Sequence, residues 1–203
     1  MYYNKGAAMF IEDYIKKSIS TKEKLLHNNK ILETINDVSN VIVSSYSRGG
    51  KVITAGNGGS AGDAQHIAGE LVSKFYFDRP GLAAVSLTTD TSIITAIGND
   101  YGYEKIFARQ IQANGNKGDV FIGISTSGNS KNILLALEEA KKKGIITVGL
   151  TGSKECLMDN LSDYIIKVPS DETPNIQEAH IMIGHIICAL VEKSLFKEKK
   201  NDN

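Results

Sequence analysis

Five short runs of apolar residues alternate with longer amphipathic stretches along this chain. Continuous apolar runs separated by helical segments are typical of a parallel sheet that helices cover on both faces. The pattern therefore predicts an α/β fold, a three-layer α/β/α sandwich around a five-stranded parallel sheet. The five runs are residues 51–56, 82–87, 119–125, 146–152 and 163–169.

The first part of the chain, residues 1–48, has no strand pattern. Residues 10–26 and 31–46 carry apolar side chains at spacings of three and four, which predicts two helices. They are hard to place in the layers that cover the sheet, and a helix pair left over from a compact domain usually buries its apolar stripe against a partner chain. We therefore expect an oligomer. The alternative is that the pair packs on its own domain.

The chain has 203 residues, which is long enough for one well-buried core and short for two. A last helix is expected over 174–196, with Thr173 as its N-cap and a proline in its first turn. We expect a single domain over residues 1–203. Its parts are a helical pair at 1–48, an α/β core at 49–196 and a solvated, disordered tail at 197–203.

The composition argues against several classes of partner. Lysine plus arginine and aspartate plus glutamate number 23 each, so net charge favours neither nucleic acid nor an anionic membrane. The longest apolar run is too short to span a bilayer, and there is no signal core, so a cytoplasmic protein is expected. Cys156 and Cys188 lack the close spacing of a zinc ribbon or redox pair, and we interpret both as buried small hydrophobic residues.

Two polar loops follow the first and third runs, at the carboxyl ends of strands where parallel α/β sheets bind ligands. In "GNGGS", residues 56–60, bare backbone N–H groups at a helix start can face an anion. In "STSGNS", residues 125–130, four hydroxyls exceed what capping needs, and Ser130 is placed to cap the next helix. The two loops predict a small phosphorylated ligand, with ordinary tight turns as the alternative. The spacing matches neither the dinucleotide fingerprint nor the P-loop.

Two helices carry candidate chemistry. His66 and Glu70 are four positions apart and share a helix face, as two metal ligands, an acid and base, or a simple surface salt link would. On the last helix, Gln177 and His185 can share a broad face, whereas His180 and His185 point about 140° apart, so at least one of these histidines is structural. The fourth histidine, in the charged N-terminal region, is expected at the surface.

The motifs together resemble one family, the bacterial phosphoheptose isomerases (sedoheptulose 7-phosphate isomerases), a branch of the flavodoxin-like SIS fold. The resemblance runs from about residue 10 to residue 196 in order and spacing. Ala55 stands where the family often has cysteine. Lys74 stands where many members have arginine, which weakens any bidentate phosphate contact. The motifs are "GNGGS", "DAQHIAGEL", "GNDYGYEKIFARQI", "GDVFIGISTSGNSKNI" and "TPNIQEAHIMIGHII".

The resemblance implies an aldose–ketose isomerase that converts sedoheptulose 7-phosphate to D-glycero-D-manno-heptose 7-phosphate, for nucleotide-activated heptose in lipopolysaccharide or capsule. It implies a homotetramer with active sites between subunits, and one zinc ion per subunit. The implied zinc ligands are His66, Glu70, Gln177 and His185. The implied substrate contacts are Asn57, Gly58, Gly59, Asn99, Asp100, Ser125, Thr126, Ser127, Ser130 and Gln177, with the serine loop on the phosphate.

The isomerisation itself requires a base that takes a proton from the carbon beside the carbonyl, giving an enediol, and a group that stabilises the oxyanion. We assign the base to Glu70 and the movement of protons among the oxygens to His185. Zinc would polarise the carbonyl or hold the geometry of the pocket. A carboxylate and an imidazole fully committed to zinc are not free to exchange protons, so a structural metal stays open.

Other functions remain within the same fold. The replication-initiator-associating SIS protein is a binding protein that resembles this chain in both loops, but it lacks the helix carboxylate and the last histidine. The presence of Glu70 and His185 favours the enzyme. A SIS sensor domain would need a fused DNA-binding module, for which this chain has no room. Isomerisation of another sugar phosphate stays an alternative.

Overall fold

The computed structural model describes residues 5–196; the predicted tail at 197–203 lies outside the described residues. Helices and strands alternate as the apolar pattern predicts. The helices are α1 (Lys5–Leu26), α2 (Asn29–Ser47), α3 (Gly59–Val72), α4 (Thr91–Tyr101), α5 (Ile106–Asn114), α6 (Lys131–Lys142) and α7 (Thr173–Leu195), with short 3-10 turns η1 (Tyr103–Lys105) and η2 (Leu157–Asn160). The strands are β1 (Val52–Gly56), β2 (Ala84–Ser86), β3 (Val120–Ile124), β4 (Ile146–Thr151) and β5 (Tyr164–Lys167).

The strands form one sheet in the order β2-β1-β3-β4-β5, and every pair is parallel. Each of the five predicted runs forms one strand, which confirms the predicted fold class. Gly56 at the end of β1 is in register with Ile124 at the end of β3. The two polar loops therefore leave the same edge of the sheet from neighbouring strands.

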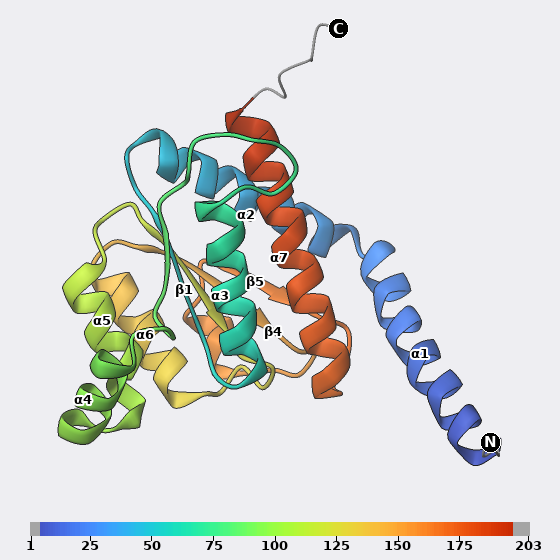
Figure 1. The fold of residues 1–203 in the computed structure, drawn as a ribbon. Coiled ribbons are helices and arrows are strands. Elements are labelled where there is room, and N and C mark those ends of the chain that lie inside the picture. Colours follow the sequence, from blue (N-terminus) through green and yellow to red (C-terminus); the bar gives the residue numbers. More distant parts are fainter. Residues whose placement is uncertain (1–4, 197–203) are drawn as a thin grey trace, which may run out of the picture.

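Helices cover both faces of the sheet, because successive strand residues point to opposite sides. Val52 contributes to a core with α2, α3 and α7, while Ile53 contributes to a second core with α4, α5 and α6. The view in Figure 1 shows these two helical layers with the strands between them. Strands buried on both faces explain why the runs are continuously apolar rather than alternating.

The two N-terminal helices behave differently. The apolar face of α2, including Ile35, Val38 and Ile42, is buried in the core against the sheet and α7. For α2, therefore, the alternative that it packs on its own domain is right. In contrast, α1 extends away from the body of the fold (Figure 1) and exposes a set of large apolar side chains. They are Met9, Phe10, Ile11, Tyr14, Ile15, Ile19 and Leu26.

Of the two predicted caps, one is displaced by one residue, and the other is in place but makes no side-chain cap bond. The N-cap of α7 is Glu172, without a side-chain cap bond, and Thr173 is already helical because the helix begins one residue earlier than expected. Ser130 does occupy the N-cap position of α6, but its hydroxyl makes no cap bond. That hydroxyl is engaged elsewhere in the serine loop.

Both cysteines are free. Cys188 is buried in the core, and burial raises the pKa of its thiol to about 12. It is the small hydrophobic residue that the sequence predicts. Cys156 is half-buried instead, and its thiol donates a hydrogen bond to Asp159 Oδ1 at 3.6 Å.

Candidate active site

The glycine-rich turn after β1 needs glycine for two reasons, the backbone conformation at Gly58 and the lack of space at Gly56 and Gly59. Gly58 has φ +56°, in the region that favours glycine. A Cβ on Gly56 would lie 2.3 Å from the carbonyl oxygen of Ser60, and one on Gly59 would lie 2.6 Å from Gln177 Nε2. The bare backbone is needed because α3 starts close against both the strand end and α7.

The serine loop gathers hydroxyls at the start of α6. Ser125 Oγ lies 2.9 Å from Ser130 Oγ and 3.4 Å from Ser127 Oγ. The backbone N–H of Asn129 donates to Ser127 Oγ at 3.2 Å. Hydroxyls that bond each other beside a helix N-terminus form a polar cluster that suits a phosphate group.

A pair of amides joins the two loops. Asn57 Nδ2 donates to Asn132 Oδ1 at 2.9 Å, and Asn132 Nδ2 donates back to Asn57 Oδ1 at 2.8 Å. The hydroxyl of Tyr103 also donates to Asn57 Oδ1, at 3.1 Å. Sequence reasoning found Asn57 but missed Asn132 and Tyr103, because a polar residue in a helix or turn carries no signal of a distant partner.

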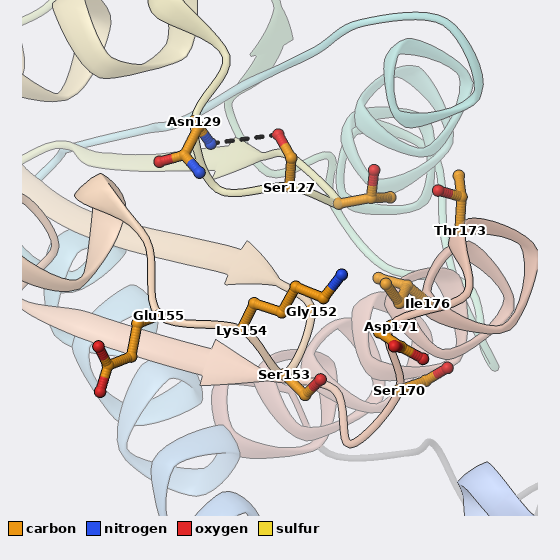
Figure 2. A pocket seen from close by; sticks show the side chains of 11 residues that line it. Ser127, Asn129, Gly152, Ser153, Lys154, Glu155, Ser170, Asp171, Thr173 and Ile176 are labelled. Carbon is orange, nitrogen blue, oxygen red and sulfur yellow. Dashed lines mark hydrogen bonds between the residues drawn. The ribbon is translucent and has the colours of Figure 1, made fainter.

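A cavity of about 230 Å³ opens beside the serine loop. Figure 2 shows the side chain of Lys154 reaching from the loop after β4 toward Thr173 and Ile176 at the start of α7. Lys154 brings a cation to this cavity, which Ser127 also lines. Lys154 is not among the residues predicted from the sequence, although its place just after a parallel strand is the same signal that identified the other two loops.

His66, Glu70 and His185 come together between α3 and α7. His66 Nε2 lies 3.0 Å from Glu70 Oε1 and 3.3 Å from His185 Nε2. Beside this group Gly184 lets the helices approach closely, since a Cβ there would lie 2.7 Å from the side chain of Ile67. The side chains of His66 and Glu70 remain 48% and 25% exposed, so a ligand can reach them.

The three residues form a group that can hold a metal ion, since their ligand atoms lie within 4.8 Å of one another. Two imidazole nitrogens and one carboxylate oxygen are ligands that zinc accepts, at separations of ~3.3 Å in tetrahedral geometry. The two Nε2 atoms that face each other also fit a shared cation, because each neutral ring can direct a lone pair there. The residues present therefore fit a metal.

His180 is the buried histidine of α7. Its side chain has no solvent exposure, and its Nε2 lies 3.2 Å from the carbonyl oxygen of Thr151. Burial lowers the pKa of His180 to about 4, and the hydrogen bond to Thr151 opposes that change. As the angular argument predicted, His180 and His185 occupy different faces, and the buried one packs in the core. His27 is exposed, as expected.

Asp63, one turn before His66, was not singled out from the sequence. It is half-buried, and its Oδ2 has no hydrogen-bond partner within residues 5–196. Burial raises the pKa of Asp63 to about 6, and the nearby His66 opposes that rise. No spacing rule identifies it, since a single aspartate near the start of a helix is most often solvated.

Four residues singled out from the sequence are not members of the three-residue group. Asn99 and Asp100 are exposed at the end of α4, where Asn99 Nδ2 donates to Asp100 Oδ1 at 2.8 Å. Lys74 is exposed in the segment after α3. The amide of Gln177 lies against Gly59 at the start of α3. Across the described part of the chain, no side-chain hydrogen bond joins Gln177 to His66, Glu70 or His185, so its place as a ligand stays a prediction.

Comparisons with known proteins identify the family of this chain. A family model described as the SIS domain matches residues 13–152. A phosphoheptose isomerase from Aneurinibacillus thermoaerophilus is 62% identical over 94% of this chain and 96% of that protein. The chain belongs to the phosphoheptose isomerase family. Phosphoheptose isomerase 2 from Campylobacter jejuni is likewise 62% identical, over 92% of this chain and 93% of its own length.

Solved structures of the phosphoheptose isomerase family share the fold. The enzyme from Francisella tularensis superposes with a TM-score of 0.88 at 38% identity, covering 92% of this chain and 98% of the other. Membership makes this protein an isomerase, as the resemblance in its motifs indicated. None of the helices within residues 5–196 is long and apolar enough to cross a membrane.

Proposed function

We propose that this protein converts sedoheptulose 7-phosphate to D-glycero-D-manno-heptose 7-phosphate. The observation that carries the proposal is the close approach of Glu70 to His66 and His185 between two helices. A carboxylate beside imidazoles, open to a ligand, can take and return a proton at a sugar carbon. The product would supply nucleotide-activated heptose for lipopolysaccharide or capsule, and a phosphorylated sugar substrate supports a cytoplasmic location.

In the proposed reaction, Glu70 takes the proton from the carbon beside the ketone carbonyl. The resulting enediol collapses to the aldose when the proton returns to the neighbouring carbon. His185 moves protons between the two oxygens, for which its partly exposed ring is suitably placed. Both side chains come from rigid helices, so the reacting atoms meet groups in fixed positions.

The phosphate end of the substrate would bind at the serine loop through Ser125, Thr126, Ser127 and Ser130. The hydroxyl cluster and the cation of Lys154 beside it support this assignment. We assign the sugar to a further set of contacts. They are Asn57, Gly58, Gly59, Asn99, Asp100 and Gln177.

We propose zinc as the metal. His66, Glu70 and His185 would hold it, with Gln177 as a fourth ligand if its amide turns from Gly59 toward them. A bound zinc ion would supply Lewis-acid stabilisation of a developing oxyanion if Glu70 and His185 ligate it loosely during turnover, and it would otherwise hold the geometry of the pocket. The donor set supports zinc over magnesium or calcium, since those ions prefer oxygen ligands alone.

We further propose a homotetramer with active sites between subunits. The apolar side chains that α1 exposes support a subunit contact there, because a patch of that kind on a helix usually packs against a partner. Asn99, Asp100 and Lys74, which are not members of the three-residue group, would then reach the site of a neighbouring subunit.

The deciding experiment is incubation of purified protein with sedoheptulose 7-phosphate, followed by NMR of the sugar, before and after chelation and after zinc is restored. An aldoheptose 7-phosphate that disappears on chelation and returns with zinc supports the reaction and the metal together. Conversion that persists after complete chelation rejects the catalytic metal. A folded, zinc-loaded protein without any conversion would point to another sugar phosphate or to a binding protein.

A further inference from the structure

The segment that follows α3 is fastened to α7 by one buried carboxylate. The side chain of Glu192 is 0% exposed and accepts the backbone N–H groups of Phe75 at 2.8 Å and Tyr76 at 2.7 Å. Arg79 Nε donates to the same carboxylate at 3.0 Å. Burial opposes ionisation, but these donors outweigh it and lower the pKa of Glu192. The carboxylate is therefore charged at neutral pH, with Arg79 as its counter-ion.

The other nitrogens of Arg79 hold the end of α3. Nη2 donates to the carbonyl oxygen of Glu70 at 2.9 Å, and Nη1 donates to that of Leu71 at 2.7 Å and of Ser73 at 3.0 Å. The last carbonyls of a helix have no partner within the helix, so the guanidinium takes that place. Because the side chain of Arg79 is only 2% exposed, water does not compete for these bonds. Arg79 thus binds the backbone of Glu70 itself.

The same carboxylate is linked to His185 of α7 through Phe75. Glu192 follows His185 by seven positions, which places the two side chains within about 20° of each other on the helix. The ring of Phe75, whose N–H bonds Glu192, lies 5.6 Å from the ring of His185 between centroids. The ion pair of Arg79 and Glu192 therefore contacts both α3 and α7, at the end where Glu70 and His185 lie. These two helices carry the metal group, which consists of His66, Glu70 and His185.

We propose that Arg79 and Glu192 are positioning residues that set Glu70 and His185 at the spacing needed for the metal group. This inference rests on the proposed metal site. A guanidinium presents five N–H donors in a fixed plane, so it is matched to several carbonyls at once, and a lysine is not. Loss of that match lets the end of α3 shift relative to α7. The shift separates the ligand atoms of His66, Glu70 and His185, which lie within 4.8 Å of one another.

A second buried carboxylate, Asp119, serves as the control for a residue that only stabilises the fold. Asp119 is also buried, and its carboxylate accepts the backbone N–H groups of Lys51 at 3.0 Å and Asn116 at 2.8 Å. Lys51 Nζ completes the set at 2.7 Å. This group lies just before β1 and β3, at the opposite edge of the sheet from the ligand loops. Its loss therefore lowers stability without touching the metal group.

The test compares Arg79→Lys, Glu192→Gln and Asp119→Asn with the wild-type protein. Binding of Co²⁺ is followed by its visible absorption, and stability by urea unfolding. We expect Arg79→Lys and Glu192→Gln to weaken Co²⁺ binding by about 10- to 100-fold, as loss of a residue that orients ligands does. Asp119→Asn is expected to lose stability but to bind Co²⁺ as the wild type does. Arg79→Lys keeps a cation opposite Glu192, so it is the variant most certain to fold.

Wild-type affinity in both Arg79→Lys and Glu192→Gln would overturn the inference, as would an equal loss in Asp119→Asn. If the wild-type protein binds neither Co²⁺ nor Zn²⁺, the proposed metal site is rejected, and the positioning role needs a separate test. The positioning role is then decided by the imidazole NMR signals of His66 and His185 in the metal-free protein. Signals that move in Arg79→Lys but not in Asp119→Asn support it, and unchanged signals reject it.

Discussion

His66 and His185 are 119 positions apart in the chain, yet their Nε2 atoms lie 3.3 Å apart. The approach arises because α3 and α7 run side by side in the same direction over one face of the sheet. Gly59 meets Gln177 near the start of both helices, and Ile67 meets Gly184 further along. With Glu70 one turn from His66, this packing assembles the chemistry from two helices that the sequence shows only separately.

Replacement of Glu70 by glutamine should remove turnover while the fold is kept. The amide has the same shape but cannot accept the substrate proton, so kcat is expected to fall by about 10²- to 10⁴-fold. Steady-state kinetics with sedoheptulose 7-phosphate measure this. Glu23→Gln on the exposed face of α1 is the control and should leave kcat unchanged. Activity within a few-fold of wild type in Glu70→Gln would remove Glu70 from the role of base.

Replacing each of the two histidines of α7 should have a different effect, one mainly on the free energy of unfolding and the other mainly on turnover. His180→Ala opens a cavity in the core, so we expect it to lower the free energy of unfolding by about 2–4 kcal/mol. His185→Ala removes a partly exposed ring and should cost less than about 1 kcal/mol while abolishing turnover. Urea unfolding and kcat, measured on both variants, test the contrast. The reverse pattern would exchange the two assignments.

Stability should depend on pH through His180. Its pKa is about 4 in the fold and 6.5 in the unfolded chain, so the unfolded state binds the proton first as pH falls. This contribution is complete above pH 6.5 and is lost toward pH 4, for a total of about 3 kcal/mol.

Asp63 acts in the opposite direction over an overlapping range, because its pKa is raised from 3.8 to about 6 and the fold favours its neutral form. The His180 contribution is therefore isolated by comparing the wild type with His180→Asn between pH 4 and pH 7. A constant difference in unfolding free energy across that range would contradict the assignment.

Ser130 should matter for ligand binding more than for its helix. Its hydroxyl makes no cap bond and pairs with Ser125, so Ser130→Ala should cost less stability than the loss of a true cap. Asn28, which accepts the N–H of Ile31 at the start of α2, is the comparison, and Asn28→Ala should cost about 1 kcal/mol. We expect KM for the sugar phosphate to rise in Ser130→Ala alone. An unchanged KM would place the phosphate elsewhere.

The exposed apolar face of α1 should be required for assembly. Ile15→Asp puts a charge among apolar side chains and is expected to reduce the molar mass of the particle measured by light scattering. Lys16→Asp puts the same carboxylate in the same turn but on a polar position that pairs with Glu12, and assembly should persist. Equal masses for wild type and Ile15→Asp would reject α1 as a subunit contact.

The sequence predicts the fold well because burial dictates its pattern. Central strands covered on both faces must be largely apolar, and the two edge strands are also short apolar runs, so all five were visible. The parallel direction of neighbouring strands β1 and β3 places both polar loops at one edge. The role of α2 was less visible, since an amphipathic helix buries its stripe equally well on its own sheet or on a partner. Only the packing of Val38 and Ile42 distinguishes the two.

For the candidate site, the sequence identifies residues that carry chemistry but not those that hold them. His66, Glu70 and His185 stand out by type and spacing. Arg79, Glu192 and Asn132 do not, because a charged or amide side chain in a loop or helix is most often solvated. Their significance comes from partners far along the chain, and no local pattern records such partners.

The distance in sequence between the two halves of the metal group also bears on synthesis. The ribosome synthesises α3 long before α7. For most of translation, His66 and Glu70 are therefore present without the ring of His185. A chain that stops short of α7 can form the early strands but carries neither His185 nor Glu192. If the group binds the proposed metal, only molecules that include α7 can retain it, and metal content then distinguishes complete chains from incomplete ones.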